Sequence, residues 1–217
     1  GGTALHIACR DGHENIIELL LASGAEINGR TVGGDTPLFL ACQAGHIKVT
    51  ERLLALGADP NKPRDNGETP LHITSELGDE PLTKLLLASG AEINGRAVDG
   101  HTPLFCACHY GHIKVVECLL ALGANINQPE NNGLTPCHIA CQEGLESIVE
   151  LLVASGAEIN RETADGFTPL FIACQSGHMK VVERLLEIGA NINQPTRTGG
   201  TPLYVACAKG RENIIDL

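Results

Sequence analysis

A motif that returns every 33 residues constrains this chain more than any other feature of its sequence. A threonine followed two residues later by an apolar residue marks each repeat, at Thr3, Thr36, Thr69, Thr102, Thr135, Thr168 and Thr201. The 33-residue step occurs six times without an insertion. Such a period predicts a stack of short supersecondary units, because a unit of this size can bury its apolar face only against its neighbours.

The repeat at residues 36–68 predicts a helix directly after its marker threonine. Thr36 suits the N-cap, and Pro37 suits the first helical position, where the missing amide hydrogen needs no partner. Apolar and small residues follow at the spacing of one helical face, at Leu38, Ala41, Cys42 and Gly45. We expect Gly45 to end this helix.

A second helix and a projecting loop complete the repeat. The side chains expected to face inward are Ile47, Thr50, Leu53 and Leu54, and those expected in solvent are Lys48, Glu51 and Arg52. Gly57 stands where a left-handed C-terminal cap belongs. The polar stretch 58–68 contains the turn pair Asn66-Gly67, so we expect an extended finger that ends in a tight turn.

The marks of this repeat resemble the signature of the ankyrin repeat family. They are Thr36-Pro37-Leu38, Ala41, Gly45-His46, Leu53-Leu54, Gly57-Ala58 and Asn61, and they return throughout the chain. The resemblance implies a mainly α repeat solenoid, in which helix-turn-helix units with β-hairpin fingers are stacked. It also implies a non-catalytic protein–protein interaction scaffold that binds a protein partner in the concave groove formed by fingers and first helices.

The spacing divides residues 1–217 into seven repeats of a single ankyrin repeat domain. Their approximate bounds are 1–35, 36–68, 69–101, 102–134, 135–167, 168–200 and 201–217. Gly1-Gly2 occupies the last finger positions of an earlier repeat, and the paired leucines of the seventh repeat would fall beyond Leu217. We therefore expect a piece of a longer array, whose first and last repeats are incomplete.

The charge balance narrows the classes of partner. The chain has 15 Lys and Arg against 26 Asp and Glu, a formal net charge of −11, and 3 % aromatic residues. This balance argues against a surface that neutralises nucleic-acid phosphates. No apolar run reaches the roughly 20 residues that a membrane-spanning helix needs. We therefore expect no nucleic-acid site and no membrane span, and we separately expect a monomer.

Six of the nine cysteines occupy one position of the repeat, at Cys9, Cys42, Cys108, Cys141, Cys174 and Cys207. Stacked helices lie about 8–10 Å apart, beyond the roughly 7 Å that a disulfide allows between Cα atoms. We therefore expect buried free thiols and a reducing, intracellular location, which favours the cytoplasm.

The pattern predicts no catalysis, no cofactor and no metal site. The one cluster that resembles metal ligands runs from Cys106 to His112, but Cys106 and Cys108 are two residues apart and point to different faces of a helix. His112 belongs to the Gly-His mark of the repeat. A nucleophile, a base and an oxyanion donor do not converge in the pattern.

The third repeat departs from the others inside its helices. Thr74 and Ser75 replace a buried alanine and cysteine, and Asp79 replaces the histidine after glycine. Buried hydroxyls cost stability unless they are hydrogen-bonded, so we expect this repeat to be the least stable. The fingers depart as well, because the aspartate usual in their turn is replaced by Thr31, Arg64, Ala97, Glu130, Thr163 and Thr196.

A second period of 66 residues overlies the first. Even repeats carry a phenylalanine where odd repeats carry a histidine: Phe39, Phe105 and Phe171 against His6, His72 and His138. Duplication of a two-repeat block explains this alternation. An alternating surface that matches a partner of similar period explains it as well.

Candidate binding residues are those that the repeat itself does not need. In the family these finger and first-helix positions line the concave groove, and here they combine apolar groups suited to hot spots with acidic groups. The candidates are Leu77, Asp99, His101, His109, Tyr110, Leu134, Glu143, Asp165 and Phe167. They favour a protein segment with basic residues and an apolar anchor, and we expect stacking to align them along one groove.

Three other interpretations stay open. The same residues fit a solvated acidic face with scattered apolar groups. The chain also fits a structural spacer in a longer array. It fits equally a regulatory or targeting ankyrin segment of a larger enzyme, channel or effector.

Overall fold

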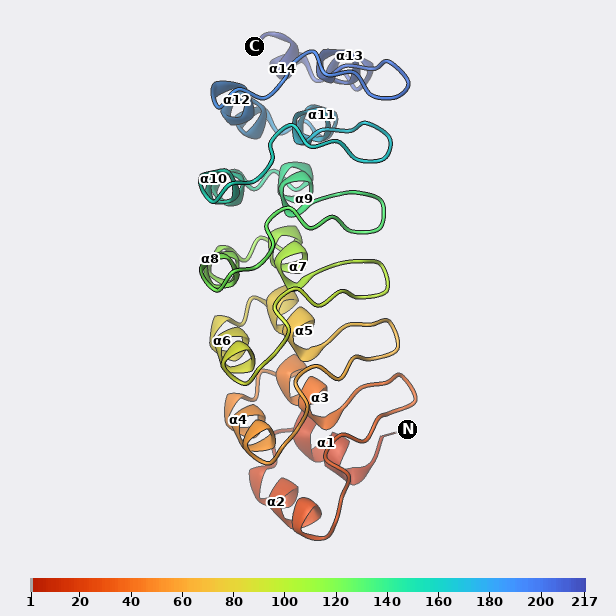
Figure 1. Cartoon of the computed structure of the whole chain (residues 1–217), viewed down its shortest axis with the longest axis vertical. Coiled ribbons are helices and arrows are strands. Elements are labelled where there is room, and N and C mark those ends of the chain that lie inside the picture. Colours follow the sequence, from red (N-terminus) through yellow and green to blue (C-terminus); the bar gives the residue numbers. More distant parts are fainter. Residues whose placement is uncertain (1) are drawn as a thin grey trace. The chain divides into compact units, whose positions relative to one another are not determined.

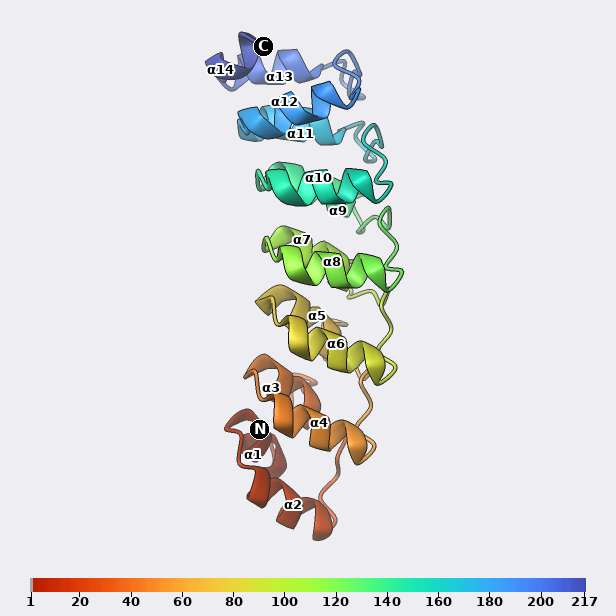
Figure 2. The ribbon, with the colours of Figure 1, turned by 90° about the vertical axis from the view of Figure 1, so that its left-hand side faces the viewer.

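The structure is a computed structural model that describes residues 2–217, so the finger position expected for Gly1 lies outside its described part. Fourteen α-helices and no β-strand are present among the described residues. First and second helices of a repeat alternate along the chain, and a longer loop separates one pair from the next (Figures 1 and 2). The helices are α1 (Ala4–Arg10), α2 (Glu14–Ala22), α3 (Pro37–Gln43), α4 (Ile47–Ala55), α5 (Pro70–Leu77), α6 (Glu80–Ala88), α7 (Pro103–His109), α8 (Ile113–Ala121), α9 (Pro136–Gln142), α10 (Glu146–Ala154), α11 (Pro169–Ser176), α12 (Met179–Glu187), α13 (Pro202–Ala208) and α14 (Glu212–Ile215).

The chain divides into two compact units, an N-terminal unit at Gly1–Ala124 and a C-terminal unit at Asn125–Leu217. In the N-terminal unit the first helices pack in the order α1, α3, α5 and α7, and α4, α6 and α8 pack in turn. In the C-terminal unit α9, α11 and α13 pack in order, as do α10, α12 and α14. The predicted helix-turn-helix stack is therefore confirmed within each unit.

The first helices begin as predicted. The hydroxyl of Thr36 accepts the amide hydrogen of Phe39 at 3.1 Å, and Pro37 opens α3. Leu38, Ala41 and Cys42 on this helix are buried. One side of α3 therefore belongs to the core, while Gly45 follows the helix with a left-handed φ of 74°.

The prediction for the second helix was wrong at one residue. Ile47, expected to face inward, is 39 % exposed, whereas Val49, Thr50 and Leu53 are buried on α4. Successive residues of a helix are rotated by about 100° around its axis. Ile47 therefore lies beside the buried face that Val49, Thr50 and Leu53 form. The expected solvent positions Lys48, Glu51 and Arg52 are exposed, and Leu54 is half-buried.

The predicted β-hairpin of the finger is not confirmed, because the loop closes through a single turn. In the second repeat the amide of Arg64 donates to the carbonyl of Glu68 at 2.8 Å, and that of Gly67 donates to Arg64 at 2.9 Å. The next amide, on Thr69, instead donates to Nδ1 of His72 at 3.1 Å. A ladder continued by two residues would need the amide of residue 70, which is Pro70 and has no hydrogen to donate.

Several of the residues that replace the usual aspartate of the finger accept the amide hydrogens of the turn with their own side chains. The hydroxyl of Thr31 accepts the amide hydrogen of Asp35 at 3.0 Å. The carboxylate of Glu130 accepts the amide hydrogens of Asn132 and Leu134 at 2.9 and 3.0 Å. Gly67 has a φ of +84°, and a Cβ atom there would lie 2.7 Å from the amide nitrogen of Val98, so this turn position requires glycine.

The polar residues that replace alanine, cysteine and histidine in the third repeat have hydrogen-bond partners. The expectation that this repeat is the least stable assumed that they have none. The hydroxyls of Thr74 and Ser75 donate to the carbonyl of Leu71 at 3.3 and 2.7 Å, and Thr83 donates to Thr74 at 3.2 Å. The carboxylate of Asp79 accepts the amide hydrogen of Leu82 at 2.9 Å and caps α6. These groups therefore avoid the cost of unsatisfied burial.

The cysteines are free, and eight of the nine are buried. Burial raises the pKa of Cys9 and Cys42 to about 12 and that of Cys174 to about 11. These thiols are therefore protonated near neutral pH. Cys207 differs from the predicted buried column, because this face of α13 is uncovered and the thiol is exposed.

The longest helices among residues 2–217 have nine residues, and none of them is long and apolar enough to cross a bilayer.

Candidate binding surface

Five rings at the start and end of α7 form a connected series, which we call the aromatic ladder. His101 stacks on Phe105 with centroids 4.4 Å apart, and Phe105 meets the edge of His109 at 6.4 Å. His109 lies 4.8 Å from Tyr110, and Tyr110 stacks on His112 at 6.5 Å. The structure therefore brings three of the predicted binding residues, His101, His109 and Tyr110, into one surface of the N-terminal unit.

Helical spacing explains how the ladder forms. Residues 101, 105 and 109 are four positions apart, so their side chains lie along one side of the helix and of its N-terminal extension. Tyr110 is the C-cap residue of α7, and His112 precedes α8. Of these rings, only Phe105 is deeply buried, and it supports the two histidines beside it.

Tyr110 combines exposure with a nearby acid. Its side chain is 51 % exposed, and Leu77, the last residue of α5, is 50 % exposed. Partial burial and the carboxylate of Glu76 raise the pKa of Tyr110 above its ordinary value. An exposed aromatic ring beside an acidic group and an exposed leucine supplies both an apolar contact and a place for a positive charge.

Asp99 is held against the ladder by its neighbour in the finger. One carboxylate oxygen accepts the amide hydrogen of His101 at 3.0 Å, and the other lies 3.0 Å from the ring Nδ1 of the same residue. The carboxylate of Asp99 therefore has a fixed position beside the ring of His101.

Arginines within the chain neutralise part of the acidic surface near the first three repeats. Arg30 pairs with Asp65 at 2.8 Å, while Arg64 pairs with Asp35 at 3.1 Å and with Glu68 at 3.5 Å. The guanidinium of Arg64 also lies over the ring of Phe39, 5.0 Å from its centroid. The sequence pattern did not predict these pairs, although stacking brings together residues about one repeat length apart, such as Arg30 and Asp65.

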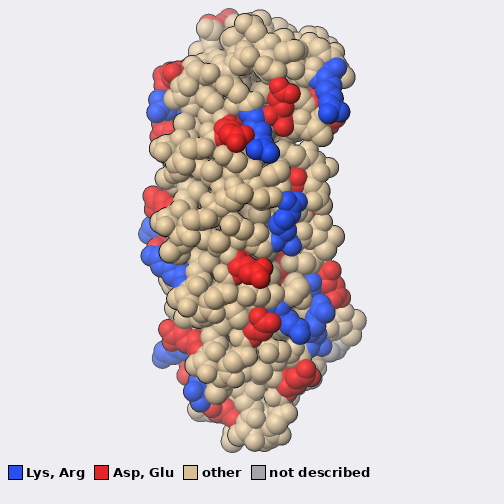
Figure 3. Space-filling view, viewed as in Figure 1, with Lys and Arg blue, Asp and Glu red and all other residues tan. Residues whose placement is uncertain are grey.

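Basic and acidic side chains are interspersed on the face drawn in Figure 3, and most of that face carries no charge. The surface is therefore not a uniform acidic field, although the chain has a net charge of −11. Steering of a basic partner must come from particular carboxylates rather than from the whole face.

The other predicted binding residues belong to the C-terminal unit. Phe167 is half-buried because its ring stacks on Phe171, with centroids 5.0 Å apart and planes at 12°. Leu134 is also half-buried, whereas Glu143 and Asp165 are exposed. Phe167 therefore takes part in packing as well as in the surface, because its ring covers Phe171.

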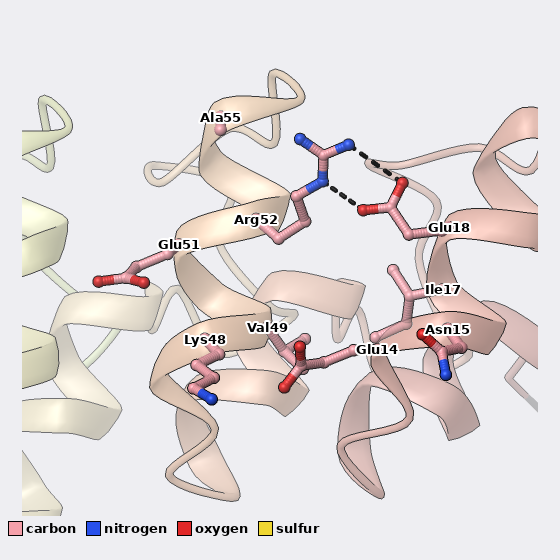
Figure 4. A pocket seen from close by; sticks show the side chains of 9 residues that line it. All are labelled: Glu14, Asn15, Ile17, Glu18, Lys48, Val49, Glu51, Arg52 and Ala55. Carbon is pink, nitrogen blue, oxygen red and sulfur yellow. Dashed lines mark hydrogen bonds and ion pairs between the residues drawn. The ribbon is translucent and has the colours of Figure 1, made fainter.

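A groove of about 490 Å³ lies between the second helices of the first two repeats (Figure 4). Its walls carry both signs of charge, and Arg52 forms two hydrogen bonds with the carboxylate of Glu18. Lys48, Glu14 and Glu51 lie on the same walls. Because the charges are mixed and the strongest pair is internal, the groove does not define one class of charged ligand.

An apolar cleft of about 150 Å³ occupies the end of the C-terminal unit. Residues of α11, α12, α13 and α14 line it, among them Leu170, Leu203 and Ile214. Apart from the thiol of Cys174, the side chains that line this cleft are apolar, so it offers no charged group that would orient a ligand.

The described residues 2–217 contain no group of three or more histidine, cysteine or acidic side chains arranged to hold a metal ion. In the Cys106–His112 segment, Cys106 is buried, and burial raises the pKa of its thiol. His112 donates through Nε2 to the carbonyl of Glu76 at 2.7 Å. Both residues are therefore engaged in packing and hydrogen bonding.

Stacked helix pairs with projecting loops and an exposed first-helix surface define a helical repeat protein. A family model described as ankyrin repeats in three copies matches residues 1–64, 52–130, 71–163 and 138–217. The chain therefore belongs to the ankyrin repeat family, whose members are generally non-enzymatic protein-interaction modules. A comparison with curated proteins finds no match to the chain.

Proposed function

We propose that this chain is a non-catalytic scaffold that binds a protein segment at the aromatic ladder. The observation that carries the proposal is the half-exposed ring of Tyr110 beside the carboxylate of Glu76. Aromatic side chains at the centre of a contact surface commonly contribute most of the binding free energy. The partner segment carries an apolar anchor that covers Tyr110 and Leu77, and a basic side chain that faces Glu76 and Asp99.

The C-terminal unit offers a second contact surface of the same composition. Phe167 and Leu134 supply its partly exposed apolar groups, and Glu143 and Asp165 supply exposed carboxylates. We assign it a supporting role, because both apolar side chains are more buried than Tyr110 and present less area to a partner.

Thiol chemistry supports the non-catalytic part of the proposal. A cysteine nucleophile reacts as its thiolate, but burial raises the pKa of Cys9, Cys42 and Cys174 to values between about 11 and 12. Eight buried free cysteines also fit a reducing compartment, which supports a cytoplasmic location.

Selection from a display library of random peptides tests the proposed surface. We expect the parent chain to enrich peptides that carry Lys or Arg near a large apolar residue. Tyr110→Ala should weaken the selected peptides about thirtyfold, the equivalent of about 2 kcal/mol. Tyr204→Ala is the matched control, since Tyr204 is 66 % exposed on α13 and is not one of the ladder residues.

The proposal fails if folded Tyr110→Ala binds the selected peptides as tightly as the parent does. It also fails if Tyr204→Ala weakens them equally. Circular dichroism of each variant separates a lost contact from a lost fold. Enrichment of acidic peptides would contradict the charge assignment while leaving the aromatic contact in place.

A further inference from the structure

The guanidinium of Arg64 occupies a site built from two carboxylates and an aromatic ring. Its Nε lies 3.1 Å from a carboxylate oxygen of Asp35, and its Nη1 lies 3.5 Å from a carboxylate oxygen of Glu68. Its central carbon lies 5.0 Å from the centroid of the Phe39 ring. Two acids and a ring face are what recognises a cation, and here the chain itself supplies that cation. We call the place formed by Asp35, Glu68 and Phe39 the Arg64 site.

The local structure holds the walls of the Arg64 site in place. The second carboxylate oxygen of Asp35 accepts the hydroxyl hydrogen of Thr31 at 3.1 Å. The carbonyl of Glu68 accepts the amide hydrogen of Arg64 at 2.8 Å. The side chains of Asp35 and Glu68 are only 20 and 25 % exposed, and the ring of Phe39 is buried. The site is therefore preformed and partly shielded from water, which strengthens its charge contacts relative to fully exposed ion pairs.

The Arg64 site adjoins the aromatic ladder. Asp35 and Glu68 directly precede the N-cap threonines of α3 and α5, and His101 of the ladder has the same position before α7. Besides the burial of its ring, the carboxylates of Glu76 and Glu68 contribute to the raised pKa of Tyr110. Glu68 is therefore close enough to act on the centre of the proposed binding surface.

Arg64 is the only cation at its position in the repeat. The corresponding residues are Thr31, Ala97, Glu130, Thr163 and Thr196. In the fourth repeat His101 covers the ring of Phe105, which corresponds to Phe39, with centroids 4.4 Å apart. The same face of the first-helix phenylalanine is therefore covered by a cation in one repeat and by a ring in the other.

The acids that lie nearer the ladder have different neighbours. Asp99 contacts the ring of His101, and Glu76 lies beside Tyr110. Neither neighbour is a lysine or an arginine. These two carboxylates are therefore the ones left to a basic side chain of a partner.

We infer that Arg64 determines the specificity of the proposed binding surface: it fills a cation site next to the aromatic ladder and so confines a partner's basic side chain to Glu76 and Asp99. A second basic residue aligned with Arg64 would meet a like charge over acids that are already compensated. The partner is therefore a segment with one basic residue beside its apolar anchor, rather than a polybasic run. The effect on the partner rests on the proposed function, whereas the cation site does not.

Arg64 stays in its site when the partner binds. Its side chain is tethered and already positioned, so a partner cation that displaced it would exchange equivalent contacts and lose its own freedom of motion. Arg64 therefore acts as a permanent occupant and marks one limit of the surface.

Binding of a small cation to Arg64→Ala tests the cation site without any partner. N-Ethylguanidinium carries the charged end of an arginine side chain, so it should enter the vacated site. We expect millimolar ethylguanidinium to shift the backbone amide NMR signals of Phe39 and Glu68 saturably in Arg64→Ala and not in the parent. Sodium chloride at the same ionic strength is one control. Arg30→Ala is the matched variant, because it removes the same charge from beside Asp65, a carboxylate that is 63 % exposed.

Paired peptides test the consequence for specificity. The first is a peptide selected on the parent with one basic residue, and two further peptides add a lysine about three residues away on either side, roughly the spacing of one repeat. The parent should gain no affinity from either added lysine. Arg64→Gln should bind one of the dibasic peptides about tenfold more tightly than the first, because two carboxylates are then open to it. Arg30→Gln makes the same change in net charge and should leave the ratio near that of the parent.

Tyr110→Ala separates this inference from the proposed function. If Tyr110→Ala weakens the peptides while Arg64→Gln gains nothing from either added lysine, the proposed function stands and the inference is overturned. A gain of equal size in Arg30→Gln also overturns it, since net charge would then explain the result. Failure of ethylguanidinium to bind folded Arg64→Ala removes the cation site itself.

Discussion

The ring of His138 joins the starts of two successive first helices. Its Nδ1 accepts the amide hydrogen of Thr135 at 3.1 Å, and its Nε2 donates to the carbonyl of Phe167 at 3.1 Å. The bond from the amide of Thr135 requires an Nδ1 without a hydrogen, so it is present only in the neutral ring with its hydrogen on Nε2. A second proton on Nδ1 would face the amide donor of Thr135, so protonation of the ring removes this bond.

Stability should therefore fall as the pH is lowered. Desolvation by burial lowers the pKa of His138 from 6.5 to about 4, and burial also lowers the pKa of His72. The unfolded chain binds a proton on His138 below about pH 6.5, whereas the folded chain does so only near pH 4. The neutral ring of His138 therefore stabilises the fold fully above pH 6.5. This stabilisation, about 3 kcal/mol, is lost as the pH falls from 6.5 to about 4.

Urea unfolding of the parent and of His138→Gln between pH 7.5 and pH 4 measures this effect. Glutamine does not titrate, so the difference between the two curves isolates the histidine from carboxylates that titrate below pH 5. Arg161 opposes protonation of His138, and Glu130 favours it, so both residues are kept in each variant. Parallel curves for parent and variant would show that His138 titrates normally in the fold.

Thiol reactivity should separate one cysteine from the other eight. Cys207 is exposed, and the remaining cysteines are buried. At neutral pH an aromatic disulfide reagent should label one thiol rapidly and the others only as fast as the protein opens. Cys207→Ser should abolish the rapid phase. Several rapid thiols in the folded parent, or a melting temperature that drops in chelator, would contradict buried thiols that hold no metal.

Phe167 and Tyr110 should differ in what their truncation changes. Phe167→Ala removes the ring stacked on Phe171 and should lower the free energy of unfolding by about 1–2 kcal/mol. Tyr110→Ala removes a half-exposed ring and should lower it by less than about 1 kcal/mol. Denaturant titration of both variants checks this order, and the reverse order would mean that Tyr110 supports the fold more than the surface.

The repeat period and local capping rules were enough to predict the helices. Thr36 and Pro37 start α3 as expected, and Gly57 adopts the predicted left-handed conformation with a φ of 92°. These features depend on neighbours in sequence or on one repeat length, which a single sequence displays directly. The position of Ile47 was missed because the start of α4 sets which residues face the core, and a shift of one or two residues rotates the inner face.

The candidate surface was only partly predictable for a different reason. Exposure of Leu77 and Tyr110 follows from their repeat positions, and both are half-exposed. Pairing of Arg64 with Asp35 and Glu68 depends on side-chain reach across loops, which the spacing of charges does not specify. A count of acidic residues therefore overstated the charge that is available to a partner.

Thr74 and Thr83 should show coupled effects on stability. From the sequence alone, Thr74→Ala with Ser75→Cys is expected to stabilise the third repeat by about 1 kcal/mol or more, because buried hydroxyls without partners are costly. In the structure Thr74 accepts a hydrogen bond from Thr83 at 3.2 Å and donates to Leu71 at 3.3 Å, and Ser75 donates to Leu71 at 2.7 Å. We therefore expect the double substitution to lower the free energy of unfolding by about 1–2 kcal/mol.

A double-mutant cycle locates the cause of this loss. Thr74→Ala alone leaves the hydroxyl of Thr83 buried without its acceptor, and should cost about 1 kcal/mol or more. Thr83→Val removes that hydroxyl at nearly constant volume, so the combination Thr74→Ala with Thr83→Val should cost less than the sum of the two single changes. Strict additivity in urea would mean that the two hydroxyls do not interact, and stabilisation by Thr74→Ala would restore the expectation from sequence.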